Sequence, residues 1–326
     1  MTDNALTAEP RDETLKGICF LLAAISIFSI QDVIVRELSG TYPVLEFVFV
    51  RSLVSLVPVS LLVWLETRGK GFWTRRPVLH LVRGTMMLLS YTFYYLAVAS
   101  LPLAAAVALF FTTPLFVTAI SALFGGEKVG PRRWSAVIVG FVGVVVIARP
   151  GVGVFELGAV FAVASAIVYA CAQVITRRLG RTESGASIVF SQTLVYILFS
   201  GLAGLLMQDL AVDKTADAGI QFLLRGWIVP AWEDAGLMAL CGLIAAAGFY
   251  GIAQAYRIGA SSAVAPFEYS GIMWGTFWGF VFWSEIPDAA TVVGIVIIVA
   301  SGIYVLRREA RLGRKIVTGR SLRGRM

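Results

Sequence analysis

Apolar segments of about twenty residues, separated by short polar turns, follow one another along nearly the whole chain. Ten such segments can be drawn, at residues 15–36, 44–65, 79–99, 103–124, 133–149, 157–177, 187–207, 235–256, 261–283 and 289–307. An α-helix of about twenty residues crosses the hydrocarbon core of a bilayer, whereas the strands of a membrane barrel are shorter and alternate in polarity. The pattern therefore predicts an all-α, polytopic membrane protein with ten transmembrane helices and no separate soluble domain.

The two halves of this pattern resemble each other. Residues 17–53 align with residues 158–194 at a constant offset of 141, which pairs Arg36 with Arg177, and a weaker match continues through each half. A duplicated membrane unit is typical of transporters built from two repeats around a central site. We therefore expect two five-helix repeats, at residues 17–149 and 157–307, between polar tails at residues 1–14 and 308–326.

The Lys and Arg residues predict the orientation of these helices. If the N-terminus lies in the cytoplasm, almost all basic residues fall on the inner side, and the outer side receives only Arg36, Arg149, Lys214 and Arg225. Such a bias places both termini in the cytoplasm. Five helices per half is an odd number, so the two repeats must have opposite orientations and form an inverted repeat.

Composition supports a membrane protein and excludes several other classes. The chain is 58% hydrophobic and 14% charged, with a mean hydropathy of +0.82, whereas soluble domains carry about 25% charged residues. The net charge of +7 does not indicate nucleic-acid binding, because the basic residues sort by membrane side rather than forming one patch. Cys19, Cys171 and Cys241 lack the spacing of a disulfide framework or a zinc site.

An ordered set of short motifs over both repeats is similar to that of the EamA family of the drug/metabolite transporter superfamily. The motifs are Arg51, Arg83-Gly84, Leu101-Pro102-Leu103-Ala104, Phe124-Gly125-Gly126-Glu127, Ala265-Pro266-Phe267-Glu268-Tyr269 and Trp283-Ser284-Glu285. The segment Thr113-Pro114-Leu115-Phe116 and residues 266–285 also resemble a subgroup proposed to carry riboflavin or S-adenosylmethionine. The resemblance implies a substrate cavity between the halves, lined mainly by helices 15–36, 79–99, 103–124, 157–177, 235–256 and 261–283.

Two pairs of polar residues are candidates for gating. Asp32 and Arg51 lie at similar depth, about 8–12 Å inside the turn that joins the first two predicted helices, at a rise of 1.5 Å per residue. Their repeat mates are Gln173 and Gln192, at matching depth near the opposite face. Because ionisable groups inside a span are costly, we expect a charged latch near the outside and an amide latch near the inside. The alternative is a static ion pair that fixes two neighbouring helices.

Glu268 is a third candidate ionisable group within a predicted helix. It lies about two turns into helix 261–283, where burial raises the affinity of a carboxylate for a proton. It could couple transport to a proton or hold a cationic group. The alternative is a hydrogen bond to the end of a neighbouring helix.

Aromatic and polar residues recur together at i, i+4 spacing and predict a lined cavity. Such pairs share a helix face and could stack a planar ring while hydrogen bonding its edge. The alternative for each tyrosine is simple helix packing or anchoring at the membrane interface. With Glu268 and its neighbour, the predicted substrate-binding residues are Phe28, Asp32, Tyr91, Tyr95, Tyr169, Gln173, Tyr250, Gln254, Glu268 and Tyr269.

Other conspicuous residues have simpler interpretations. Glu127 and Glu285 are expected to cap helix hairpins, Arg83 to extend to the inner membrane surface, and His80 to be a solvated interface residue. Gly271, Gly275 and Gly279 form a stripe of small residues, which predicts close helix packing, with dimerisation as the alternative.

The chain lacks a phosphate-binding GxxxxGK[ST] loop, an HExxH motif and a GxSxG nucleophile motif. We therefore expect no enzyme activity, cofactor or metal. The predicted function is secondary active transport of a small metabolite, similar to riboflavin, S-adenosylmethionine or an amino acid, across a bacterial inner membrane by alternating access, with a proton as candidate coupling ion. The alternatives are an exporter or exchanger of amino acids or toxic metabolites, and a non-transporting scaffold or receptor. The pattern leaves the oligomeric state open.

Overall fold

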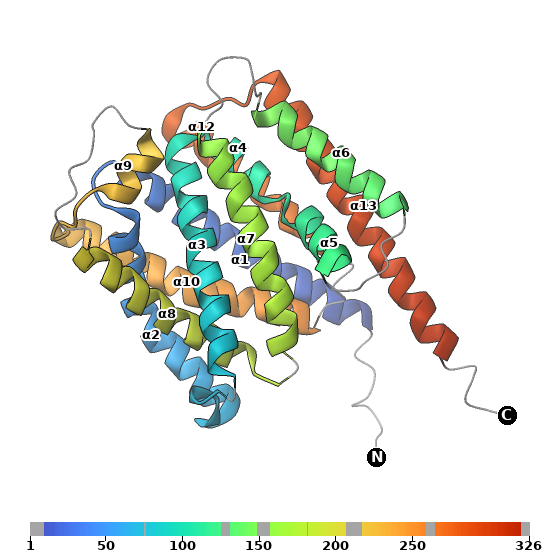
Figure 1. The fold of residues 1–326 in the computed structure, drawn as a ribbon, viewed down its shortest axis with the longest axis horizontal. Helices are drawn as coiled ribbons and strands as arrows, with labels where there is room; N and C mark the ends of the chain where they lie inside the picture. The colour runs from blue at the N-terminus through green and yellow to red at the C-terminus, as the bar shows by residue number, and fades with distance from the viewer. Residues whose placement is uncertain are drawn as a thin grey trace.

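The computed structural model in Figure 1 describes residues 10–74, 76–124, 131–148, 157–180, 182–206, 217–258 and 265–320. Within these residues every element is a helix, so the predicted all-α class is confirmed. The elements are α1 (Pro10–Leu38), α2 (Val44–Thr67), η1 (Lys70–Phe72), α3 (Pro77–Ser100), α4 (Leu103–Phe110), α5 (Thr113–Phe124), α6 (Pro131–Ala148), α7 (Leu157–Leu179), α8 (Gly185–Leu206), α9 (Ala218–Leu224), α10 (Trp232–Ile258), η2 (Ala265–Tyr269), α12 (Ser270–Trp283) and α13 (Ala289–Arg320).

The lengths and surfaces of these helices are those of a multi-pass membrane protein. Six stretches are long and apolar enough to span a bilayer: Leu15–Leu38, Val44–Thr67, Leu103–Ile120, Leu157–Thr176, Gly185–Leu206 and Trp232–Ile252. Trp134–Ala148 and Ala289–Val305 are shorter apolar helices. On α2, Val57, Leu61 and Leu65 are 73%, 56% and 61% exposed. A continuous apolar face of this kind would be a liability in water and is the natural surface toward lipid.

The segment predicted as one helix at 103–124 is two helices, α4 and α5, with a break at Phe111 and Thr112. Pro114 has no N–H to donate to the carbonyl of Phe110, four residues earlier. The hydroxyl of Thr113 donates to that carbonyl at 2.6 Å, and the hydroxyl of Thr112 donates to the carbonyl of Leu109 at 2.6 Å. The Thr113 hydroxyl thus satisfies the Phe110 carbonyl, which Pro114 leaves without an N–H partner, and the Thr112 hydroxyl adds to the backbone bond that Leu109 already accepts from Thr112.

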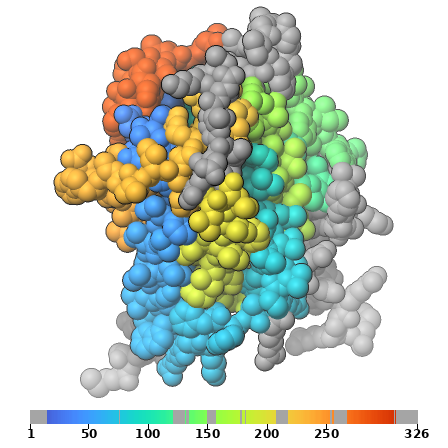
Figure 2. Space-filling model, turned by 60° about the vertical axis from the view of Figure 1, so that its left-hand side comes forward, coloured from blue at the N-terminus to red at the C-terminus, as the bar shows by residue number. Residues whose placement is uncertain are grey.

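The main helix contacts join the two halves of the chain. Figure 1 shows α3 beside α7 and α6 beside α13, and the other extensive contacts are α1 with α10 and α2 with α8. Figure 2 shows α2, α8 and α3 side by side on one face. Each of these four pairs takes one helix from residues 17–149 and one from residues 157–307. The halves therefore interlock and share one hydrophobic core.

The glycine stripe of α12 serves this packing. A Cβ atom at Gly275 would lie 3.1 Å from Val107 and 3.4 Å from the carbonyl oxygen of Leu103, both on α4. A Cβ atom at Gly271 would lie 2.7 Å from the ring of Phe111. The predicted role in close helix packing is confirmed within the chain.

Each end of the bundle is held by contacts between the halves. At the end where α3 gives way to α4, here called the α3–α4 end, Arg36 forms an ion pair with Glu285, and Tyr42 donates to Asp234 at 2.6 Å. At the opposite, α2–α3 end, Thr74 donates to Glu183 at 2.8 Å, and Glu66 accepts from the backbone N–H of Ala186 at 3.3 Å. The structure is therefore joined across the halves at both ends.

Candidate functional site

Three tyrosines of α3 lie at the centre of the bundle. Tyr95 is fully buried, Tyr94 is buried, and Tyr91 lies one turn before Tyr95 on the same helix face. The ring centroids of Tyr91 and Tyr95 are 6.1 Å apart. Their hydroxyls bring polar chemistry into an apolar interior and must be matched by partners.

Arg51 of α2 is enclosed by these rings. It is 2% exposed, and its Nη1 donates a hydrogen bond to the hydroxyl of Tyr95 at 2.7 Å. Its guanidinium carbon lies 5.4 Å, 5.5 Å and 5.9 Å from the ring centroids of Tyr91, Tyr95 and Tyr196. The negative faces of aromatic rings attract a cation, so three rings partly replace the water that Arg51 has lost.

The hydrogen bonds of Tyr95 extend to α1 and α10. Because the Tyr95 hydroxyl accepts from Arg51, its own proton is free to donate to the side-chain oxygen of Gln31 at 2.8 Å. In that amide orientation the Gln31 nitrogen donates to the carbonyl of Cys241 at 3.2 Å. One chain of bonds thus links α1, α2, α3 and α10.

Asp32 of α1 accepts a hydrogen bond from the hydroxyl of Tyr94 at 2.9 Å. Among the described residues the ion pairs are Arg36–Glu285 and His80–Glu183, so Asp32 and Arg51 are not in direct contact in this conformation. They bind adjacent tyrosines, whose ring centroids are 6.0 Å apart. The two predicted gating residues are therefore connected through α3.

A second buried arginine binds one member of the other predicted gating pair, Gln192. Arg83 is 5% exposed; its Nη1 donates to Gln192 at 2.8 Å and its Nε donates to Thr176 at 2.6 Å. Gln192 in turn donates to the hydroxyl of Tyr196 at 3.1 Å. The expectation that Arg83 extends to the membrane surface is wrong, because α3 turns this side chain toward α7 and α8.

The remaining predicted residues lie around this centre in two groups. Tyr169 lies close to Gln173 and Glu268, and its ring contacts Phe110 at 5.4 Å. Tyr269 is buried, contacts the ring of Phe111 at 5.8 Å, and has a hydroxyl without a hydrogen-bond partner among the described residues. These contacts place the start of α12 against the break between α4 and α5.

Phe28 and the α10 residues form the other group. The ring of Phe28 contacts Phe249 at 5.3 Å, and Phe249 contacts Tyr91 at 6.2 Å. Gln254 is buried, whereas Tyr250 is 39% exposed and lies on the outer side of α10. The structure thus brings Phe28 next to the tyrosines and leaves Tyr250 away from them.

Two cavities accompany these residues. The cavity beside Arg51 has a volume of about 10 Å³ and is lined by polar side chains from α2 and α8, namely Arg51, Ser52, Ser55, Gln192, Thr193 and Tyr196, together with apolar residues. That volume is at the limit for one water molecule. The halves are therefore nearly closed around Arg51 in this conformation.

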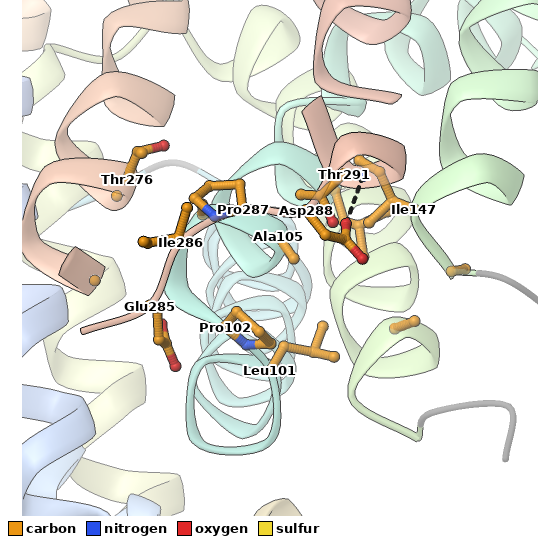
Figure 3. Close-up of a pocket in the computed structure, with 16 residues that line it drawn as sticks. Leu101, Pro102, Ala105, Ile147, Thr276, Glu285, Ile286, Pro287, Asp288 and Thr291 are labelled. Carbon is orange, nitrogen blue, oxygen red and sulfur yellow. Dashed lines mark hydrogen bonds between the residues drawn. The ribbon is translucent and has the colours of Figure 1, made fainter. Parts of the chain in front are cut away.

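The larger cavity, of about 370 Å³, lies off the centre at the α3–α4 end. Figure 3 shows it between the start of α4, with Pro102 just before the helix and Ala105 within it, and the segment that carries Glu285 to Asp288. In that segment the Asp288 carboxylate accepts from the backbone N–H of Thr291 at 2.9 Å. The cavity borders the ion pair of Arg36 and Glu285 rather than the tyrosines.

Glu285 caps a helix, as expected, but the helix is α4 rather than one of those in its own hairpin. Its carboxylate binds Arg36 and accepts from the backbone N–H of Leu103, the first residue of α4, at 3.0 Å. The Arg36 guanidinium also lies 4.4 Å from the ring centroid of Trp283. A carboxylate at a helix N-terminus is favoured by the helix dipole, so this cluster fixes α1, α4 and α12 together.

His80 does not lie at a solvated interface. His80 is 4% exposed and its Nε2 lies 3.9 Å from Glu183, so it is a buried residue rather than the solvated one that we expected. Glu127, Arg149 and residues 321–326 lie outside the described residues. Among the residues that are described, no three His, Cys, Asp or Glu side chains are grouped closely enough to hold a metal ion.

Three members of the central network were not predicted as such: Gln31, Arg83 and Tyr196. Tyr196 follows Gln192 by four residues, the same spacing that was used to select other aromatic and polar pairs. Arg83 carries no comparable signal, because its distance from the predicted helix end gives its depth but not the direction of its side chain.

Comparison with known proteins places this arrangement in context. The model of the EamA-like transporter family matches residues 15–149. The pseudopaline exporter CntI of Pseudomonas aeruginosa is 32% identical to this chain over 90% of the chain and 96% of its own length. The S-adenosylmethionine uptake transporter of Rickettsia prowazekii is 25% identical over 91% of this chain and 94% of its own. The riboflavin transporter of Rhizobium johnstonii is 26% identical over 97% and 98%.

Proposed function

Because this chain belongs to the EamA-like transporter family, we propose that it is a secondary active transporter that moves a small metabolite across a bacterial inner membrane by alternating access. The family relation makes it a transporter rather than an enzyme. The observation that carries the proposal is the buried network of Arg51, Tyr95, Arg83 and Gln192, because it joins helices of both halves inside an apolar bundle. Ionisable groups at such a depth mark substrate pathways.

The helix contacts support ten crossings in two inverted repeats. Exchange of the repeats takes α1 to α7, α2 to α8, α3 to α10 and α6 to α13. Under this exchange the contacts α2–α8 and α6–α13 map onto themselves, and α3–α7 maps onto α1–α10. The lesser contacts α2–α10 and α3–α8 also map onto each other. A two-fold axis in the membrane plane would produce this set of contacts.

The break between α4 and α5 and the 3₁₀ segment η2 support a substrate site between the two halves. The break at Phe111 and Thr112 corresponds by sequence to the 3₁₀ segment η2, which precedes α12. Discontinuous helices at equivalent places in two repeats are typical of the substrate region in secondary transporters. The contact between Phe111 and Tyr269 brings the break between α4 and α5 next to η2.

We further propose that the structure represents an occluded state, since both ends are joined and the cavity at Arg51 holds about 10 Å³. Breaking the Arg36–Glu285 contact would open the α3–α4 end, which the distribution of basic residues makes the external side. Asp32 and Arg51 would control access from that side, and Gln173 and Gln192 from the cytoplasmic side, where both termini lie.

Flux in proteoliposomes tests this function. A panel of labelled metabolites, with riboflavin, S-adenosylmethionine and amino acids included, is supplied with and without an imposed pH gradient, and protein-free vesicles serve as the control. We expect at least one solute to accumulate only with the protein. If a proton is coupled, the gradient raises that accumulation and Glu268→Gln removes the increase. Flux equal to that of empty vesicles for every solute would favour a scaffold or receptor.

A further inference from the structure

Arg51 and Arg83 share an unusual electrostatic environment. Each is almost completely buried, and neither has a carboxylate within 4.0 Å among the described residues. A guanidinium remains charged at any physiological pH, so it cannot relieve its burial by losing a proton. Buried charges in proteins are normally paired with an opposite charge or with a metal.

The groups that surround the two arginines are neutral. The rings of Tyr91, Tyr95 and Tyr196 surround Arg51, and Arg83 binds the side chains of Thr176 and Gln192. The two arginines are connected through α8, because Gln192, which Arg83 binds, donates in turn to the hydroxyl of Tyr196, whose ring faces Arg51. The nearby acids are engaged elsewhere: Asp32 binds Tyr94, and Glu268 lies next to Tyr169 and Tyr269.

Both arginines retain hydrogen-bonding capacity. A guanidinium has five N–H donors. Within the described part of the chain, Arg51 donates through Nη1 alone, and Arg83 donates through Nε and Nη1. Arg51 lines the small cavity together with Gln192, the residue that Arg83 holds in place, and with the hydroxyl-bearing Ser52, Ser55 and Thr193.

We propose that Arg51 and Arg83 form the binding site for an anionic group, a carboxylate or a phosphate, of the transported metabolite. This inference rests on the proposed function and specifies its substrate class. Arg51 contacts the anion through its free N–H groups, and Arg83 adds positive charge and orients Gln192 toward the cavity. The anion is the counter-charge that the protein itself does not supply. The faces of Tyr91 and Tyr196 then border the uncharged remainder of the substrate.

The first test needs no substrate. The thermal unfolding midpoint of the purified protein is measured for the wild type, for Arg51→Gln and for a control, Arg76→Gln, which removes an exposed arginine at the start of α3. If Arg51 is an unpaired charge kept for a ligand, its neutralisation leaves the midpoint unchanged or raises it. A structural arginine would give the opposite result, and a clear fall in the midpoint of Arg51→Gln alone would overturn the proposal.

The second test uses matched solutes in the flux assay. Tryptophan is compared with tryptophan amide, S-adenosylmethionine with its decarboxylated form, and riboflavin 5′-phosphate with riboflavin. We expect flux only for anionic members, at least tenfold above the partner, and a loss of at least tenfold in Arg51→Gln and Arg83→Gln but not in Arg76→Gln. Equal flux of both partners, or undiminished flux in Arg51→Gln, would overturn the proposal. If no solute moves in any variant, the transporter function fails, and the anion site is judged by the unfolding midpoints alone.

Discussion

At the scale of single residues, the centre of the molecule depends on hydroxyls that act as both donors and acceptors. The hydroxyl of Tyr95 accepts from Arg51 and donates to Gln31, so it converts a buried cation and a buried amide into one continuous chain of bonds. An aliphatic side chain at this position would remove one hydrogen-bond partner from each of Arg51 and Gln31. Phenylalanine keeps the shape of the ring and isolates the contribution of the hydroxyl.

The variant Tyr95→Phe tests this role. Because the Arg51 and Gln31 side chains would lose a buried partner, we expect unfolding to become easier by about 1–3 kcal/mol. The free energy of unfolding can be measured by denaturant titration in detergent, with Tyr304→Phe, at a position that is 45% exposed, as the matched control. An unchanged free energy for Tyr95→Phe would contradict the network described here.

The polar centre could be predicted only in part at this scale. The sequence identified Arg51, Asp32, Tyr91, Tyr95 and Gln192, because charged and amide groups in apolar segments stand out. It could not specify the partners, since sequence spacing gives the depth of a residue along its helix but not the rotation of that helix about its axis. That rotation directs Asp32 to Tyr94, Arg83 to Gln192 and Tyr250 outward.

At the scale of helices, glycines set how closely the two halves approach each other beside the polar centre. A Cβ atom at Gly242 of α10 would lie 2.4 Å from the carbonyl oxygen of Arg51 and 2.9 Å from Val54, both on α2. A Cβ atom at Gly84 of α3 would likewise lie 2.8 Å from Val195 of α8. Both contacts leave no room for a methyl group.

The variant Gly242→Ala should therefore force α10 away from α2 next to Arg51. We expect a loss of about 1–3 kcal/mol in the free energy of unfolding, together with reduced transport, because backbone atoms are the obstacle. Gly236→Ala is the matched control, since it lies on the same helix and its new methyl group would have no neighbouring atom within 4 Å. Equal effects of the two substitutions would show that the close approach is unimportant.

The positions of the helices could be predicted from the sequence more completely than the breaks within them. Long apolar segments predicted the positions of the helices, and Gly, Pro and charged residues marked the turns. The break at Phe111 was not predicted, because an internal proline is compatible with a continuous helix, as Pro58 in α2 demonstrates. What differs at Pro114 is the preceding Thr113, whose hydroxyl binds the Phe110 carbonyl that the proline cannot reach with an N–H group.

At the scale of the whole molecule, the closure of both ends around a small central cavity is the main feature to explain. The α3–α4 end is held by Glu285, which binds Arg36 and the start of α4 at once. The α2–α3 end is held by Glu183, which accepts from Thr74 and lies near His80. Alternating access requires these two groups of contacts to open in turn, so fixing one of them should stop transport.

A reversible cross-link at the α3–α4 end tests the account most directly. Leu103 of α4 and Gly279 of α12 are suited to it, since a Cβ atom at Gly279 would lie 3.7 Å from that of Leu103, within the range for a disulfide. Leu103→Cys and Gly279→Cys are combined in a chain whose Cys19, Cys171 and Cys241 are replaced by alanine, and the two single variants are the controls. We predict that oxidation abolishes flux in the double variant alone and that a reductant restores it. Full flux through the oxidised, cross-linked protein would contradict transport by alternating access between the two halves.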